Sequence, residues 1–262
     1  MRAVPSLRDF VFRLRYGFRG VPVNMGSRVI RLDESLRRWD MQSESQIQRI
    51  IVETLRSGDC MLDIGANFGL HSLLAGSIVG PEGEVHAFEP LPANLKRLRH
   101  HLKLNYLEHV VRVVPSAISD SSETTISFFS GADELGTTAS IAKSGGNTKQ
   151  VTVANTRLDD YLSKIKRPVR LMKIDVQGAE LRVLRGGRKL LEAQKPLLVI
   201  EVHAFAFPDF GTSLQEFKCF LKRFGYNEGI LPGSTLRNGS HYQAVYRQPD
   251  HSFQQLATQT TI

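Results

Sequence analysis

The sequence has few of the features that stabilise secreted or membrane-embedded proteins. Among 262 residues there are only two cysteines, Cys60 and Cys219, which lie far apart without Cys-x-x-Cys spacing. We interpret them as buried thiols in a reducing compartment and expect a cytoplasmic protein. The longest apolar run, 196–207, is interrupted by Glu201 and His203 and is too short to cross a bilayer. No signal-peptide pattern is present, so we expect neither export nor a transmembrane segment.

The sequence also lacks a basic segment interleaved with aromatic residues. Its net charge is +8 and its pI is near 9.7, but lysine and arginine are spread along the whole chain. Because no nucleic-acid-binding motif accompanies this charge, we expect no nucleic-acid partner. An anionic small-molecule substrate, or solubility alone, explains the charge equally well.

The length allows one large α/β domain with or without an appendage. Residues 1–50 are predicted to form a basic helical segment, because the first twenty positions hold five arginines against one acid, Asp9. A transit peptide or a membrane-surface helix is the alternative for these first positions. Residues 51–248 are predicted to form the main domain, followed by a polar tail, 249–262, that we expect to be disordered.

Short apolar runs alternate with longer helical patterns, which indicates βα units and a mostly parallel sheet in a doubly wound α/β fold. The expected strands are 60–64, 84–88, 110–114, 169–175 and 196–203. The expected helices are 71–79, 92–104, 179–191 and 213–224. Between 116 and 157 we expect an antiparallel excursion, with strands 124–129 and 151–153 joined by a mobile loop. Residues 229–246 are expected to form a closing hairpin.

The turn after strand 60–64 carries the clearest functional signal. It contains Asp63, Gly65, Asn67 and Gly69 and is followed directly by a helical pattern. Glycine lets the backbone bend sharply and lets a ligand approach closely, while a helix start offers N–H groups to an anionic group. A strand, a glycine turn and a helix in this order are typical of a nucleotide-cofactor site at the carboxyl end of a sheet.

The residues inside this turn favour one cofactor over another. Dinucleotide enzymes use a G-x-G-x-x-G turn whose middle glycine makes room for pyrophosphate, whereas Asn67 and Phe68 would crowd that group. Asp63 suits a ligand with an ammonium group, and S-adenosylmethionine carries that group and a sulfonium but no phosphate. We therefore expect S-adenosylmethionine, with an NAD-dependent Rossmann enzyme or a turn without ligand as the alternatives.

Two further strand ends extend the expected cofactor site. Glu89 follows strand 84–88 about twenty residues beyond the glycine turn, where an acid accepts hydrogen bonds from ribose hydroxyls. Segment 116–120 follows strand 110–114, and its polar groups are placed to reach the adenine ring. The alternative for both is an ordinary cap or turn residue.

Acidic and imidazole side chains mark the other half of the expected site. Asp175 ends strand 169–175, and Glu201 and His203, two residues apart in strand 196–203, point to the same face. Such a carboxylate and imidazole can deprotonate an alcohol or bind a divalent cation, although the sequence does not itself support a metal. A hydrogen-bonded structural histidine is an equal alternative for His203.

Together these segments resemble the FkbM-type methyltransferase family, a branch of the class I S-adenosylmethionine-dependent enzymes. The matching segments are 62–72 (LDIGANFGLHS), 85–92 (VHAFEPLP), 117–120 (AISD), 156–162 (TRLDDYL), 172–187 (MKIDVQGAELRVLRGG) and 198–203 (LVIEVH). The resemblance implies a Rossmann-like, mostly parallel seven-stranded sheet with an antiparallel C-terminal strand. It also implies methyl transfer, commonly to oxygen on a sugar, glycolipid or natural product.

The resemblance assigns roles by position. The residues implied to bind the cofactor are Asp63, Gly65, Asn67 and Gly69 at the methionine end, Glu89 at the ribose, and Ile118 and Asp120 at the adenine. The residues implied to face the transferred methyl group are Asp175, Glu201 and His203.

One departure from the family pattern leaves room for other functions. The family usually reads Asp-Val-Glu-Gly where this chain has Gln177, which weakens the case for catalysis or metal binding at that position. A catalytically weak, methyltransferase-like binding module is therefore one alternative. A nucleic-acid methyltransferase is another, but the Asn/Asp-Pro-Pro-Tyr/Phe sequence typical of one is missing after strand 169–175. We expect a small-molecule or carbohydrate acceptor.

Overall fold

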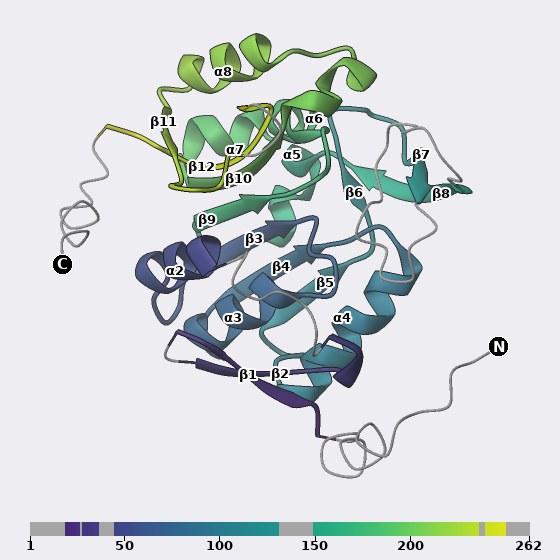
Figure 1. The fold of residues 1–262 in the computed structure, drawn as a ribbon, viewed down its shortest axis with the longest axis vertical. Coiled ribbons are helices and arrows are strands. Elements are labelled where there is room, and N and C mark those ends of the chain that lie inside the picture. The colour runs from purple at the N-terminus through teal and green to yellow at the C-terminus, as the bar shows by residue number, and fades with distance from the viewer. Residues whose placement is uncertain (1–18, 27, 37–44, 131–148, 236–238, 250–262) are drawn as a thin grey trace.

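The fold is built around one seven-stranded sheet (Figure 1). The computed structural model describes residues 19–26, 28–36, 45–130, 149–235 and 239–249. The sheet order is β11-β12-β10-β9-β3-β4-β5. Its strands are β3 (Cys60–Ile64), β4 (Glu84–Phe88), β5 (Val111–Val114), β9 (Val169–Ile174), β10 (Leu197–His203), β11 (Asn227–Ile230) and β12 (His241–Arg247). Five neighbouring strands are parallel to one another, in the order β10, β9, β3, β4 and β5. Strand β12 is antiparallel to both of its neighbours, β10 and β11. The expected Rossmann-like fold is confirmed.

Helices cover both faces of this sheet, as Figure 1 shows. One layer contains α2 (Ser45–Thr54), α3 (Leu70–Val79) and α4 (Pro92–Leu104). The other contains α5 (Leu158–Tyr161), α6 (Glu180–Gly186), α7 (Arg188–Ala193) and α8 (Leu214–Arg223). Neighbouring strand residues such as Met61 and Leu62 belong to different apolar clusters, one on each face. Burial on both faces explains why the central strands are continuous apolar runs.

Glycines and caps define where these helices begin and end. The helix expected over 179–191 is divided at Gly187, which separates α6 from α7. A Cβ on Gly186 would lie 2.2 Å from the carbonyl oxygen of Ser119, so the backbones pack closely at this break. Helix α8 begins with a capping box, because Ser213 accepts the backbone N–H of Glu216 and the Glu216 carboxylate accepts the N–H of Ser213.

The N-terminal part of the described chain differs from the expectation. Strands β1 (Val21–Met25) and β2 (Arg28–Leu32) form an antiparallel hairpin, followed by a short 3-10 turn, η1 (Glu34–Leu36). The helical expectation for residues 1–50 is therefore wrong over these two strands. The buried side chains of the hairpin join the cluster that includes α2 and α3.

Other predictions for the ends of the chain concern residues outside the described ranges. Residues 1–18, which hold most of the N-terminal arginines, are among these, as are 250–262 of the predicted disordered tail. The division into 1–50, 51–248 and 249–262 stays a prediction, and residue 50 lies within α2.

The antiparallel excursion forms a separate small sheet. Its strands are β6 (Ala117–Ile118), β7 (Thr125–Ser130) and β8 (Lys149–Thr156), in the order β6-β8-β7. Strands β7 and β8 are antiparallel as expected, while β6 pairs with β8 in parallel. The loop expected to be mobile, 131–148, lies outside the described residues. Two further 3-10 segments, η2 (Leu162–Lys164) and η3 (Ala204–Phe210), follow α5 and β10.

The two cysteines form no disulfide. Cys60 is buried in β3, whereas Cys219 is exposed on α8, so the expectation of two buried thiols is wrong for Cys219. The cytoplasmic location stays a prediction. In the described part of the chain, no helix is both long and apolar enough to cross a membrane.

Candidate active site

The candidate site lies where β3, β4, β9 and β10 end along one edge of the sheet. The glycine turn after β3 is held between the neighbouring strands, because Gly65 and Ala66 donate their N–H groups to the carbonyl oxygen of Phe88 at 3.0 and 2.9 Å. Gly65 has φ of 80°, and a Cβ there would lie 1.9 Å from the carbonyl oxygen of Asp175. Gly69 has φ of 94°, and its Cβ would lie 2.3 Å from Leu98. Both positions therefore require glycine.

Glu89 holds the glycine turn from the end of β4. Its carboxylate accepts the backbone N–H of Asn67 at 2.8 Å and that of Leu91 at 2.9 Å, and the side-chain amide of Asn94 at 3.4 Å. Glu89 is only 4% exposed, and this burial raises its pKa to about 7 although these hydrogen bonds favour the charged form. Each carboxylate oxygen has two lone pairs, so Glu89 can also accept further donors. The structure thus brings together two of the predicted cofactor residues, Asn67 and Glu89.

A buried lysine joins the ends of β3 and β9. The Lys173 Nζ donates to the carbonyl oxygen of Gly65 at 2.9 Å and lies 3.4 Å from Asp63 Oδ1 and 3.7 Å from Asp175 Oδ2. The other oxygen of Asp63 accepts the hydroxyl of Ser72 at 2.5 Å. The positive charge of Lys173 therefore stabilises a carboxylate on each side of it.

Asp175 lies in the turn that follows β9. Its Oδ1 accepts the side-chain amide of Gln177 at 3.1 Å, while its Oδ2 faces Lys173. The pKa of Asp175 is raised mainly by burial and secondly by the nearby negative charge of Glu201. Gln177 has φ of 53°, a left-handed conformation within this turn. Gln177 therefore donates a hydrogen bond to Asp175 at the position where the family pattern has a glutamate.

Two histidines and two acids form a cluster at the ends of β10 and β12. His203 Nδ1 lies 2.8 Å from Glu180 Oε1, and its Nε2 lies 3.6 Å from Glu201 Oε1. His241 Nε2 lies 2.8 Å from the same Glu201 oxygen, and the two imidazole rings stack with centroids 4.6 Å apart. Although burial lowers it, the pKa of His203 is raised to about 10 by hydrogen bonds to Glu180 and Glu201. His203 is thus charged at neutral pH and is a poor proton acceptor in this arrangement.

The residues expected at the adenine lie further along the chain. Ile118 is buried in β6 and belongs to the same apolar cluster as Phe88. Asp120 accepts a hydrogen bond from Arg182 Nε at 2.9 Å, which ties the segment after β6 to α6. Their roles toward the cofactor stay predictions.

Comparison with known proteins identifies the family of this site. Residues 63–228 match the family model described as the methyltransferase FkbM domain, which covers more than half of the chain. The protein belongs to the FkbM methyltransferase family. The expected class, an S-adenosylmethionine-dependent methyltransferase, is confirmed at this level, and the NAD-dependent alternative has no support from the family.

Individual relatives are distant from this FkbM-family protein. The hexuronic acid methyltransferase AglP of Haloferax volcanii is 27% identical over 184 residues, covering 70% of this chain and 72% of the relative. The 31-O-demethyl-FK506 methyltransferase FkbM of Streptomyces tacrolimicus is 29% identical over 202 residues, covering 66% and 74%. A solved structure of a putative rRNA methylase from Clostridium thermocellum has a TM-score of 0.51 at 13% identity, covering 78% of this chain and 94% of that one. The last similarity supports the fold alone.

Sequence reasoning assigned no role to three residues of the site. Lys173 and Glu180 lie within the segments that resemble the family. A lysine between apolar residues of a central strand indicates a buried charge, and this pattern could have identified Lys173 as a site residue. His241 lies outside those segments, at the start of β12.

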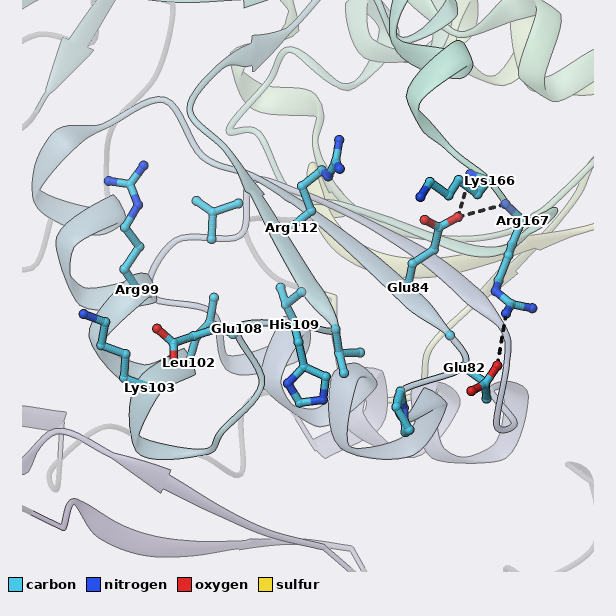
Figure 2. A pocket seen from close by; sticks show the side chains of 15 residues that line it. Glu82, Glu84, Arg99, Leu102, Lys103, Glu108, His109, Arg112, Lys166 and Arg167 are labelled. Atoms are coloured by element: carbon cyan, nitrogen blue, oxygen red, sulfur yellow. Dashed lines mark hydrogen bonds and ion pairs between the residues drawn. The ribbon is translucent and has the colours of Figure 1, made fainter.

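A polar surface pocket lies elsewhere on this FkbM-family protein (Figure 2). Basic side chains of α4 and β5, including Arg99 and Arg112, line it together with the first residue of β4, Glu84. Glu84 accepts the backbone N–H groups of Lys166 and Arg167, both at 2.8 Å. The pocket therefore lies at the amino end of β4, away from the edge that carries the glycine turn.

Proposed function

We propose that this protein transfers the methyl group of S-adenosylmethionine to a hydroxyl oxygen of a small-molecule or carbohydrate acceptor. The observation that carries the proposal is the chain of charged groups from Asp63 through Lys173 to Asp175. It links the glycine turn to a partly exposed carboxylate at the same edge of the sheet.

The residues of the glycine turn fit the methionine end of the cofactor. Asn67 Oδ1 is a buried acceptor oxygen without a hydrogen-bond donor among the described residues, whereas Asp63 Oδ1 has only the ion-pair contact with Lys173 Nζ at 3.4 Å and can accept a further donor. Buried acceptors without donors are costly, and the ammonium group of S-adenosylmethionine would supply donors and positive charge. Gly65 and Gly69 keep the turn free of side chains. We assign Glu89 to the ribose hydroxyls.

The adenine assignment follows from the chain order rather than from a contact. Ile118 and Asp120 follow β5, the strand next to β4 in the sheet. An apolar side chain and a hydrogen-bonding side chain at this position suit the ring and its exocyclic amine. The bound cofactor supplies an electrophilic methyl group on sulfur, and alignment of the acceptor with that group is the main contribution required of the protein.

For the acceptor half we favour Asp175 over His203 as the proton acceptor. The Asp175 side chain is 28% exposed and its pKa is raised, so it is reachable and more basic than an ordinary aspartate. His203 is 2% exposed and carries its proton between two carboxylates. We therefore assign His203 and Glu201 to positioning rather than to proton transfer.

Two relatives support the acceptor class by their names alone. One is a hexuronic acid methyltransferase and the other methylates 31-O-demethyl-FK506. The net charge of +8 also suits an acceptor that carries a carboxylate, such as a uronic acid.

Two matched variants test this proposal. Asp63→Asn should weaken S-adenosylhomocysteine binding by about 10- to 100-fold, measured by calorimetry, because a charge-assisted hydrogen bond is lost. Asp175→Asn should keep that affinity and lower methyl transfer by about 100- to 10,000-fold. Transfer is followed with methyl-labelled cofactor and a panel of uronic-acid glycosides, neutral sugars and hydroxylated natural products.

Three results would count against the proposal. Unchanged affinity in Asp63→Asn would remove the cofactor assignment, and wild-type turnover in Asp175→Asn would remove the base. Cofactor binding without transfer to any member of the panel would favour the binding-module alternative that Gln177 leaves open.

A further inference from the structure

The strand pairing of β10 and β12 places three metal-ligating side chains on one face of the sheet. His203 and His241 are direct partners in the antiparallel register, and Glu201 precedes His203 by two residues. Side chains two residues apart in a strand share a face. Their ligand atoms, one from each residue, all lie within 4.8 Å of one another.

The distances between these atoms are close to those of a metal site. Zinc binds imidazole nitrogen and carboxylate oxygen at about 2.0–2.2 Å, which places neighbouring donors roughly 3 to 3.5 Å apart. Glu201 Oε1 lies 2.8 Å from His241 Nε2 and 3.6 Å from His203 Nε2. Because the two imidazole donors also lie within 4.8 Å of each other, side-chain rotation would bring all three donors around one ion.

A second carboxylate already orients one of the histidines. Glu180 is fully buried, and its Oε1 lies 2.8 Å from His203 Nδ1 and also accepts the backbone N–H of Gly178 at 3.0 Å. In this arrangement Nδ1 of His203 donates its proton to Glu180, and Nε2 points toward Glu201. A carboxylate behind a ligating histidine is the usual support of protein metal sites.

We propose that Glu201, His203 and His241 bind a divalent first-row transition-metal ion, for which Zn²⁺ is the best-matched probe. Two imidazoles and one carboxylate form a donor set that proteins use for Zn²⁺ and Fe²⁺, whereas Mg²⁺ and Ca²⁺ prefer oxygen ligands. The side chains of Glu201 and His241 are 15% and 19% exposed, so the ion can reach the cluster from that edge.

The carboxylates around the cluster favour a cation at His203. Those of Asp175, Glu180 and Glu201 lie near this imidazole, and Lys173 is paired with the first of them. Without a metal ion the cation is the proton on the imidazole, and a divalent ion bound at Nε2 would take the place of that proton.

The site gives the proposed function a second way to activate its acceptor, and this consequence rests on that function. Three protein ligands would leave coordination positions free on the ion, and Asp175 lies near enough to Glu201 and His203 to interact with both electrostatically. A metal-bound hydroxyl is more acidic than a free one, because the cation stabilises the alkoxide. The acceptor hydroxyl would then lose its proton to Asp175 as its oxygen bonds to the methyl carbon and the bond from that carbon to sulfur breaks, which leaves S-adenosylhomocysteine.

A second group of residues in the described chain serves as a control. Cys60, Glu84 and His86 also approach one another, but at the opposite end of the strands. Burial raises the pKa of the Cys60 thiol, which keeps it protonated, and His86 Nδ1 lies 3.0 Å from the hydroxyl of Tyr161. We expect no metal there.

The test is metal titration of chelator-treated protein, read by the visible spectrum of Co²⁺ and by calorimetry with Zn²⁺. We expect one ion per chain in the wild type, and affinity weakened at least about tenfold in His241→Ala and in Glu201→Gln. Both residues lie at the exposed side of the cluster, so these variants should fold, whereas a change at His203 would disturb the buried core. His86→Asn is the matched control and should keep wild-type affinity.

The outcomes separate this proposal from the proposed function. Absence of a Co²⁺ spectrum and of Zn²⁺ heat, or undiminished binding in His241→Ala, would overturn the metal site. Loss of binding in His86→Asn alone would assign the ion to the other group and overturn it as well. S-adenosylhomocysteine affinity, measured on the same samples, tests the cofactor site independently of either result, and methyl transfer by the wild type tests the proposed function itself.

Discussion

Replacement of Glu89 by glutamine tests the electrostatics of the glycine turn. The carboxylate accepts the N–H groups of Asn67 and Leu91 and is almost completely buried. Burial raises its pKa from 4.5 to about 7, so the native protein keeps Glu89 protonated to a higher pH than the unfolded chain does. Glutamine has nearly the same shape but cannot ionise. Glu89→Gln therefore removes the titration while keeping the packing.

The sign and size of the effect follow from the two pKa values. Below about pH 4.5, Glu89 is protonated in both states, and its stabilising contribution is fully present. As the pH rises, the unfolded chain releases the proton first, so the free energy of unfolding falls. The loss is complete above about pH 7 and amounts to about 3 kcal/mol, because one pKa unit corresponds to about 1.4 kcal/mol.

Urea unfolding of the wild type and Glu89→Gln, from about pH 4 to about pH 8, measures this contribution. Other titrating groups affect both proteins equally, so they cancel in the difference between the two unfolding free energies. We expect the variant to gain about 3 kcal/mol relative to the wild type between these limits. A difference that stays constant within about 0.5 kcal/mol would refute the raised pKa of Glu89.

Three further substitutions give distinct outcomes. Gly65→Ala should lower the free energy of unfolding by more than about 2 kcal/mol and abolish S-adenosylhomocysteine binding, since its Cβ would lie 1.9 Å from the Asp175 carbonyl oxygen; a wild-type melting curve would contradict this. Lys173→Met should lower the free energy of unfolding in urea by about 3–5 kcal/mol, because Asp63 would stay buried without an opposing charge. A decrease of less than about 1 kcal/mol would argue against the ion pair. Ser213→Ala should cost about 1 kcal/mol through the lost cap of α8 and leave cofactor affinity unchanged.

Local patterns in the sequence were sufficient to predict the sheet and the glycine turn. A buried strand followed by Gly65 and Gly69 has few alternative conformations, because both glycines adopt a positive φ. The N-terminal hairpin was missed because the interpretation there followed charge. In β2 the buried Ile30 and Leu32 alternate with the exposed Arg31, and this period of two indicates a strand.

The acceptor half could be predicted only in part, since it depends on long-range pairing. Glu201 and His203 were identified because they share one strand. His241 lies 40 residues beyond Glu201 and reaches it through the antiparallel register of β10 and β12, which no local pattern specifies. Glu180 reaches His203 across 23 residues, from the start of α6.

The departure at Gln177 fits the proposed role of Asp175. The side-chain amide of Gln177 donates to one oxygen of Asp175, while Lys173 faces the other. A glutamate at position 177 would remove that donor and add a negative charge, and both changes would raise the pKa of Asp175 further. Asp175 already lies near the negative charge of Glu201, so a third acid would favour its protonated form, which cannot accept a proton from a hydroxyl. Gln177 therefore favours the carboxylate of Asp175, the form that the proposed reaction requires.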